Sequence, residues 1–148
     1  MKGTFLVVED EENDVYFLIR ALNKAGVPNA TQVVQDGQLA IDYLSGNGAF
    51  ADRSVYPLPE LVFLDLKLPR VHGLEVLKWI RAQPNLAPLV VIVLTSSPVR
   101  EDIERAYRLG ANSYVVKPSS PDQLIQIAAH FRDWWLTHNE PPPGKDGA

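Results

Sequence analysis

The sequence predicts an α/β fold in which a five-stranded parallel sheet is doubly wound, with helices on both of its faces. Two observations support this prediction. Short apolar runs with the composition of buried strands alternate five times with segments whose apolar residues recur at helical spacing. Most of the connections between these segments are short, as expected for successive β–α units of a parallel sheet.

The expected strands are short apolar runs in which β-branched residues are common. Buried strands of a parallel sheet appear in a sequence as continuous apolar runs, because both faces of the sheet are covered. The run over residues 89–94 fits this description best. In chain order, the expected strands cover residues 5–8, 32–34, 61–64, 89–94 and 113–116.

Capping residues mark the ends of the expected helices. Asn13 and Ser97 are expected to be the N-caps of the first and fourth helices, and Ser120 forms a capping box with Gln123 at the start of the fifth. Gly26 is expected to follow the first helix in the C′ position. In chain order, the helices are expected to end near Gly26, near Gly46, at Ala82, before Gly110 and near Leu136.

The chain of 148 residues is expected to form one domain over residues 1–136, followed by a flexible C-terminal tail over residues 137–148. The tail contains three consecutive prolines at residues 141–143 and is too short for a second folded domain. We therefore expect no effector domain. The long connection over residues 45–60 is expected to be a surface loop.

Composition excludes several classes of function. The net charge of −4 disfavours binding to nucleic acid, and no apolar run has the length needed to span a membrane. Without cysteine the chain has no disulfide, no thiolate nucleophile and no cysteine-based metal site, and its three histidines show no metal-ligand spacing. We expect a cytoplasmic protein.

Polar residues follow four of the expected strands. Because the carboxyl ends of parallel strands meet at one edge of the sheet, we expect these side chains to lie close together. They are Glu9 and Asp10 after the first strand, Asp65 after the third, Thr95 and Ser96 after the fourth, and Lys117 after the fifth.

Carboxylates that cluster in this way repel one another and need a cation nearby. With oxygen ligands alone, that cation is expected to be Mg²⁺, with Mn²⁺ as the other possibility. A lysine and hydroxyl groups beside it can donate hydrogen bonds to phosphoryl oxygens. The residues therefore predict phosphoryl transfer onto or off a carboxylate.

These motifs resemble the receiver domains of two-component response regulators. The resemblance runs from about residue 4 to residue 136 and rests on four motifs: Val8-Glu9-Asp10, Asp65 followed by Pro69 and Gly73, Thr95-Ser96, and Lys117-Pro118. It implies a flavodoxin-like (βα)5 fold. It also implies a Mg²⁺-dependent phosphorelay, in which the chain accepts a phosphoryl group from a sensor histidine kinase and signals through protein contacts. The chain would not be an enzyme beyond assisting its own phosphorylation and dephosphorylation.

The resemblance implies a role for each acidic residue of the site. Asp65 would be the phosphoacceptor. Asp10 would bind the metal directly with Glu9 assisting, and Asp65 and the backbone carbonyl of Lys67 would be further ligands. By contrast, Glu11, Glu12 and Asp14 are expected to be solvated residues at a helix start, where acids interact well with the helix dipole.

Four further residues receive roles from the same resemblance. Thr95, Ser96 and Lys117 would contact the phosphoryl oxygens, and Tyr114 would be the aromatic switch partner of Thr95. Asp65, Lys117 and Thr95 would then carry the transfer itself. The resemblance also implies a cis peptide bond between Lys117 and Pro118. His72 departs from the family pattern, which has Asp, Asn or Ser before the glycine, and is expected to affect the loop but not the transfer.

A narrower resemblance involves the segment 65–69, the long loop at 45–60 and the aromatic segment 131–137. These features are similar to those of stand-alone receivers that serve phytochrome-type histidine kinases, which implies such a kinase as partner. Adjacent helix positions point about 100° apart, so Trp134 and Trp135 cannot both face the core. We expect Trp134 to face outward and, with Ile103 and Tyr107, to build a homodimer through the fourth helix, fifth strand and fifth helix.

Three other functions remain as alternatives. A phosphoaspartate phosphatase of the haloacid dehalogenase type also places an Asp after a buried strand, but it needs a second Asp two positions later, where this chain has Lys67. A flavin- or nucleotide-binding domain is disfavoured because no glycine-rich phosphate loop follows any expected strand. A receiver that signals without phosphate is disfavoured by the complete set of site residues.

Overall fold

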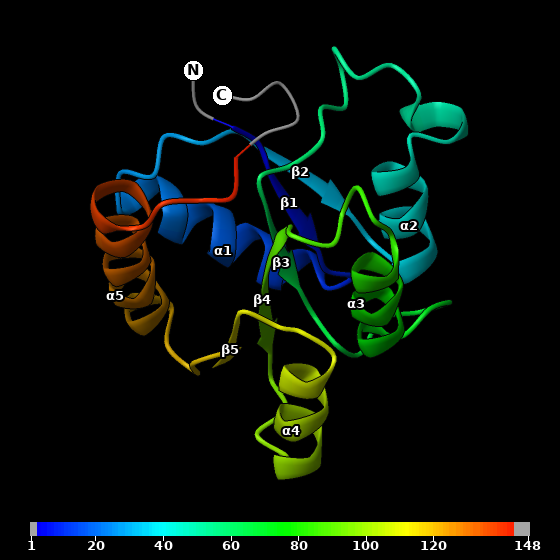
Figure 1. Ribbon diagram of the computed structural model, residues 1–148. Helices are drawn as coiled ribbons and strands as arrows, with labels where there is room; N and C mark the ends of the chain where they lie inside the picture. The colour runs from blue at the N-terminus through cyan, green and yellow to red at the C-terminus, as the bar shows by residue number, and fades with distance from the viewer. Residues whose placement is uncertain (1–2, 144–148) are drawn as a thin grey trace.

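Five parallel strands form one sheet in the order β2-β1-β3-β4-β5, as shown in Figure 1. The computed structural model describes residues 3–143. The strands are β1 (Phe5–Val8), β2 (Thr31–Val34), β3 (Leu61–Leu64), β4 (Val90–Thr95) and β5 (Ser113–Val116). Their bounds lie within one residue of those expected, and every neighbouring pair is parallel, which confirms the predicted fold class.

Helices cover both faces of this sheet, with α1 and α5 on one face and α2, α3 and α4 on the other (Figure 1). They are α1 (Glu12–Lys24), α2 (Gly37–Ser45), α3 (Gly73–Ala82), α4 (Arg100–Arg108) and α5 (Pro121–Arg132), with short helical turns at η1 (Gly48–Phe50) and η2 (Asp133–His138). Within residues 3–143, no helix combines the length and the apolar character that crossing a membrane requires.

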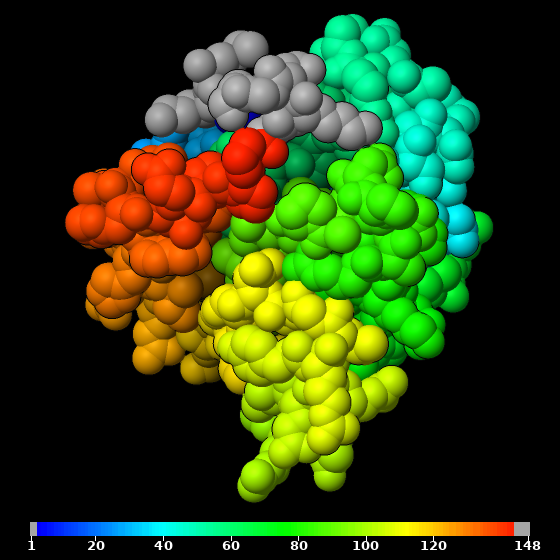
Figure 2. All heavy atoms as spheres, in the orientation of Figure 1, coloured from blue at the N-terminus to red at the C-terminus, as the bar shows by residue number. Residues whose placement is uncertain are grey.

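The central strands have buried residues on both faces, which is why their sequences are continuously apolar. In β1, Phe5 and Val7 pack with α1 and α5, whereas Leu6 and Val8 pack with α2 and α3. The edge strand β5 is only partly buried. Of α4, only Ala106 is fully buried, and the helix stands out from the rest of the molecule in the space-filling view of Figure 2.

Two of the expected N-caps are wrong. Glu11 and Val99 have extended backbones, with ψ angles of 113° and 128°, so α1 begins at Glu12 and α4 at Arg100. Asn13 therefore lies inside the first turn of α1. The hydroxyl of Ser97 instead accepts a hydrogen bond from the backbone N–H of Val99 in the turn before α4.

Other helix ends are confirmed. Gly26 follows α1 with φ of +81°, a conformation that glycine adopts without a steric penalty. Ser120 accepts a hydrogen bond from the backbone N–H of Gln123 at 3.4 Å, as expected for the N-cap of α5.

The connection over residues 45–60 is held against α2 by Arg53 and Tyr43. The guanidinium of Arg53 donates to the backbone oxygens of Tyr43 and Leu44 at the end of α2, and also to that of Tyr56 in its own loop. The hydroxyl of the buried Tyr43 donates to the backbone oxygen of Pro57. The bonds to Tyr43 and Leu44 fall in the last turn of α2, where a helix leaves carbonyl groups that its own N–H groups do not fully satisfy.

The C-terminal part of α5 continues into η2, whose hydrogen bonds have π-helical spacing. The expected domain end at residue 136 falls inside η2, and residues 144–148 of the expected tail lie outside the described residues. Trp135 is 5% exposed and Trp134 is 49% exposed, which confirms that the two rings face in different directions.

Candidate functional site

Asp65 directly follows β3 at the carboxyl edge of the sheet and is 7% exposed. Its Oδ1 atom accepts a hydrogen bond of 2.7 Å from the backbone N–H of Leu66. The loop after Asp65 folds back on itself, because the N–H of Gly73 donates to the backbone oxygen of Leu66. Asp65 is therefore a buried carboxylate on a tightly folded loop.

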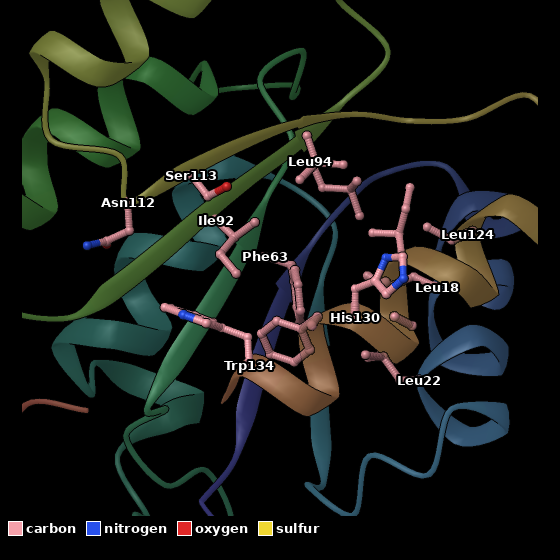
Figure 3. Close-up of a pocket in the computed structure, with 14 residues that line it drawn as sticks. Leu18, Leu22, Phe63, Ile92, Leu94, Asn112, Ser113, Leu124, His130 and Trp134 are labelled. Carbon is pink, nitrogen blue, oxygen red and sulfur yellow. The ribbon is translucent and has the colours of Figure 1, made fainter. Parts of the chain in front are cut away.

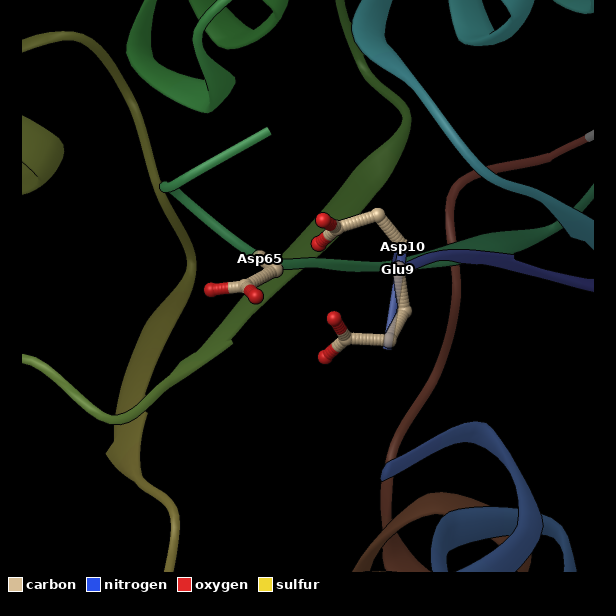
Figure 4. A group of neighbouring side chains, drawn as sticks. All are labelled: Glu9, Asp10 and Asp65. Atoms are coloured by element: carbon tan, nitrogen blue, oxygen red, sulfur yellow. The ribbon is translucent and has the colours of Figure 1, made fainter. Parts of the chain in front are cut away.

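Glu9 and Asp10 leave the neighbouring strand β1 and turn their carboxylates toward Asp65, as Figure 4 shows. One ligand oxygen from each of these three residues lies within 4.8 Å of the others. The pKa of Glu9 is raised to about 7, mainly because the carboxyl group is buried. The nearby charge of Asp65 also raises this pKa, whereas the hydrogen bond from Lys117 lowers it. Three oxygen ligands that repel one another fit a hard divalent cation.

Lys67 lies two residues after Asp65, with an exposed side chain. Because Lys67 bears no carboxylate, the chain lacks the second acid that a haloacid dehalogenase-type phosphatase needs at this position. The role of its backbone carbonyl as a metal ligand stays a prediction.

Arg70, further along the same loop, has a positive φ of 67°.

Lys117 follows β5 and brings its ammonium group to the acidic cluster. Its Nζ atom donates to Oε1 of Glu9, to Oδ2 of Asp14 at 2.9 Å and to Oδ2 of Asp65 at 3.3 Å. Burial lowers the pKa of Lys117, but the hydrogen bonds to Glu9 and Asp14 and the charge of Asp65 outweigh this and leave the pKa above its ordinary value. Lys117 is therefore a fixed positive charge beside Asp65.

The sequence does not predict the hydrogen bond between Lys117 and Asp14, because it indicates that Asp14 is a solvated residue at a helix start. Asp14 lies in the first turn of α1, near residues that are exposed. The spacing of apolar residues in α1 could have placed Asp14 toward the sheet, but it could not have identified Lys117 as its partner.

Thr95 ends β4 and is fully buried, and its hydroxyl has no hydrogen-bond partner among residues 3–143. A buried hydroxyl without a partner is costly, so this atom is suited to bind an incoming group. The backbone oxygen of Thr95 accepts a hydrogen bond from the N–H of Lys117, which links the ends of β4 and β5. Ser96 is exposed.

Tyr114 lies in β5 beside Val93 and reaches the loop that follows β4. Its hydroxyl donates to the backbone oxygen of Ser97 at 2.8 Å, and burial raises its pKa. The peptide bond between Lys117 and Pro118 is trans, so the cis bond that the resemblance implies is not found here. Trans is the isomer that an X–Pro bond favours, by about 0.5–1 kcal/mol.

His72, the departure from the family pattern, is the N-cap of α3. Its Nδ1 atom accepts a hydrogen bond of 3.1 Å from the backbone N–H of Leu74. An imidazole nitrogen thus satisfies a helix N–H group, the task that Asp, Asn or Ser commonly performs.

The fold and the arrangement of acids, hydroxyl and lysine are those of a signalling receiver. A family model described as the response regulator receiver domain matches residues 5–129, and the chain belongs to this family.

Three relatives are similar over nearly the whole chain. FilR2 of Methanothrix harundinacea, described as a probable methanogenesis regulatory protein, is 37% identical over 93% of this chain and 86% of that protein. The response regulator Rcp1 of Synechocystis is 30% identical over 88% of this chain and 87% of its own length, and its Mn²⁺-bound crystal structure gives a TM-score of 0.85. The phosphorylated cyanobacterial phytochrome response regulator RcpA gives a TM-score of 0.88 at 34% identity, covering 96% of this chain and 99% of that one.

Proposed function

We propose that this chain is a single-domain response regulator that accepts a phosphoryl group on Asp65. The observation that carries the proposal is the position of Asp65, with Oδ2 3.3 Å from Nζ of Lys117 and with ligand oxygens of Glu9 and Asp10 within 4.8 Å. This arrangement combines a nucleophile, a positive charge and a cation site at one strand edge.

Glu9, Asp10 and Asp65, together with the backbone carbonyl of Lys67, would hold Mg²⁺. The relative Rcp1 has a Mn²⁺-bound form, which supports a divalent cation in this chain as well. When bound, such a cation neutralises the clustered carboxylates and the charge of the phosphoryl group.

In the transfer, an oxygen of the Asp65 carboxylate attacks the phosphorus of a phosphohistidine. The bond between the imidazole nitrogen and phosphorus breaks, and the nitrogen keeps the electron pair. Lys117, Thr95 and Ser96 donate to the phosphoryl oxygens. Its neighbouring carboxylates hold the pKa of Lys117 above its ordinary value, so the ammonium group is charged before the transfer begins.

The signal would travel through Thr95 and Tyr114. Binding of the phosphoryl group gives the Thr95 hydroxyl its missing partner, and the ring of Tyr114 follows. Movement of Tyr114 breaks its hydrogen bond to Ser97 and remodels the surface of α4, β5 and α5.

That surface would mediate the output of the protein, through a downstream protein or a homodimer. Tyr107 and Trp134 are half exposed there, and Ile103 lies on the same helix as Tyr107. Trp134 lines an apolar groove of about 390 Å³ between α5 and the sheet, together with Phe63 and Ile92 (Figure 3). Half-exposed aromatic rings beside an apolar groove favour a protein interface.

The partner that supplies the phosphoryl group would be a sensor histidine kinase of the phytochrome type, acting in the cytoplasm. The support is the similarity to RcpA, described as a phytochrome response regulator. The chain would turn over no separate substrate and would assist only its own phosphorylation and dephosphorylation.

Intact mass spectrometry tests the proposal. Incubation with acetyl phosphate and Mg²⁺ should add one phosphoryl group to the wild type and none to Asp65→Asn. The exposed acid Glu75 offers a control, since Glu75→Gln should be phosphorylated like the wild type. A wild-type protein that gains no mass would contradict the proposal.

A further inference from the structure

The ammonium group of Lys117 has all of its hydrogen-bonding capacity in use. An ammonium group donates three hydrogen bonds, and three carboxylates accept them here: Glu9, Asp14 and Asp65. The side chain of Lys117 is 16% exposed, so water has little room to replace any of the three.

Asp14 differs from the other two acceptors. Glu9 and Asp65 belong, with Asp10, to the cluster whose oxygens could share a metal ion, and Asp14 is not a member of that cluster. Asp14 also comes from a different element, the first turn of α1, and its side chain is 42% exposed. Its position thus serves Lys117 and not the cation.

A divalent cation and Lys117 would compete for two of the same carboxylates. Nζ of Lys117 donates to Oε1 of Glu9 and to Oδ2 of Asp65, and these two residues also belong to the acidic cluster, so a cation bound there would weaken the hold of both carboxylates on Lys117. In the absence of Asp14, the displaced ammonium group would lose its carboxylate partners in a largely buried place, which is costly.

We infer that Asp14 is a positioning residue, which holds Lys117 at the side of the site while a divalent cation occupies Glu9, Asp10 and Asp65. The inference rests on the cation site of the proposed function. It predicts that Asp14 favours metal binding although it does not touch the metal, because it gives Lys117 a partner in the metal-bound state.

Calorimetric titration with Mg²⁺ alone, without a phosphodonor, tests this role. Asp14→Asn and Glu12→Gln each remove one negative charge from the first turn of α1, but only Asp14 contacts Lys117. Asp14→Asn should weaken Mg²⁺ binding about two- to fivefold more than Glu12→Gln does, the range of a partly exposed ion pair. Circular dichroism checks that both variants are folded.

The same two substitutions in a Lys117→Met background show whether Asp14 acts by positioning Lys117 or only through its own negative charge. There the extra effect of Asp14→Asn should vanish, because the residue it positions is gone. Equal effects of Asp14→Asn and Glu12→Gln in the wild-type background, or an extra effect that persists without Lys117, would overturn the inference. A wild-type protein that binds no Mg²⁺ would instead count against the proposed cation site itself.

Discussion

Gly73 packs directly on the backbone of Asp65, since a Cβ atom at position 73 would lie 2.1 Å from the backbone oxygen of Asp65. The first residue of α3 thereby determines how closely the helix approaches the residue we propose as phosphoacceptor. The N–H of Gly73 also donates to the backbone oxygen of Leu66 at 2.7 Å. Glycine is required here for space, because any side chain would collide with backbone atoms.

The substitution Gly73→Ala should therefore damage both stability and phosphorylation. We expect the free energy of unfolding to fall by about 1–3 kcal/mol, because the loop after β3 must move to make room. Phosphorylation by acetyl phosphate should slow as Asp65 shifts. Urea unfolding and the rate of mass gain measure the two effects.

Glu75→Ala is the control for this prediction, because Glu75 is exposed on the same helix. It should change the free energy of unfolding by less than about 0.5 kcal/mol. A Gly73→Ala protein as stable and as reactive as Glu75→Ala would show that the close approach is unnecessary.

Arg81 links α3 to the loop before β4 and to the loop before β5. Its guanidinium donates to the backbone oxygens of Ala87, Leu89 and Gly110, and to Oδ1 of Asn112. A lysine cannot reach all of these acceptors, so Arg81→Lys should lower the free energy of unfolding by about 2–3 kcal/mol. Urea unfolding measures this loss.

Arg105→Lys provides the comparison, since Arg105 is exposed in the last turn of α4. It should leave stability within about 0.5 kcal/mol of the wild type. If both arginine variants lose the same stability, the hydrogen bonds of Arg81 do not account for the effect.

Burial of Glu9 makes metal binding depend on pH. The pKa of this acid rises from 4.5 to about 7, so the metal-free protein holds a proton on Glu9 below neutral pH. Because the folded metal-free protein binds this proton more tightly than the unfolded chain does, protonation of Glu9 adds to the free energy of unfolding at low pH. This added stability is lost as the pH rises through about 7. Mg²⁺ must displace the proton, so its affinity should fall about tenfold from pH ~8 to pH ~6.

Calorimetry at both pH values measures this change, and Glu9→Gln is the informative variant. It should bind Mg²⁺ more weakly than the wild type at the higher pH, with less change between the two values. An affinity of the wild type that does not vary with pH would contradict the assignment of Glu9.

Trp134 provides the test of the homodimer. Trp134→Ser should shift sedimentation of the phosphorylated protein toward the monomer, because it removes a half-exposed ring from the apolar groove. Tyr16→Ser removes another exposed ring, 62% exposed on α1, and should leave the dimer intact. If Trp134→Ser leaves the dimer unchanged, Trp134 is not part of the dimer interface.

The strands and the strand-end residues could be predicted because their signals are local. A continuous apolar run identifies a buried strand, and parallel strands bring Glu9, Asp65 and Lys117 to one edge whatever their separation in the chain. The opposite directions of Trp134 and Trp135 likewise follow from helix geometry alone.

Other features depend on contacts that the sequence does not contain. The start of α4 is set by the extended backbone of Val99, although Ser97 has the chemistry of an N-cap. From the sequence, Asp14 is one more acid at a helix start, and its contact with Lys117 depends on how α1 and α5 pack on the same face of the sheet.

The most direct test of the central claim is to locate the phosphoryl group chemically. After reaction with acetyl phosphate and Mg²⁺, borohydride reduces an acyl phosphate to an alcohol, which converts aspartate to homoserine. Peptide mapping should then find homoserine at position 65 and at no other acid, and only when Mg²⁺ was present. Two results would contradict the account. One is reduction of Asp10 or Glu9 to the corresponding alcohol instead of Asp65, and the other is no reduction at Asp65 at all.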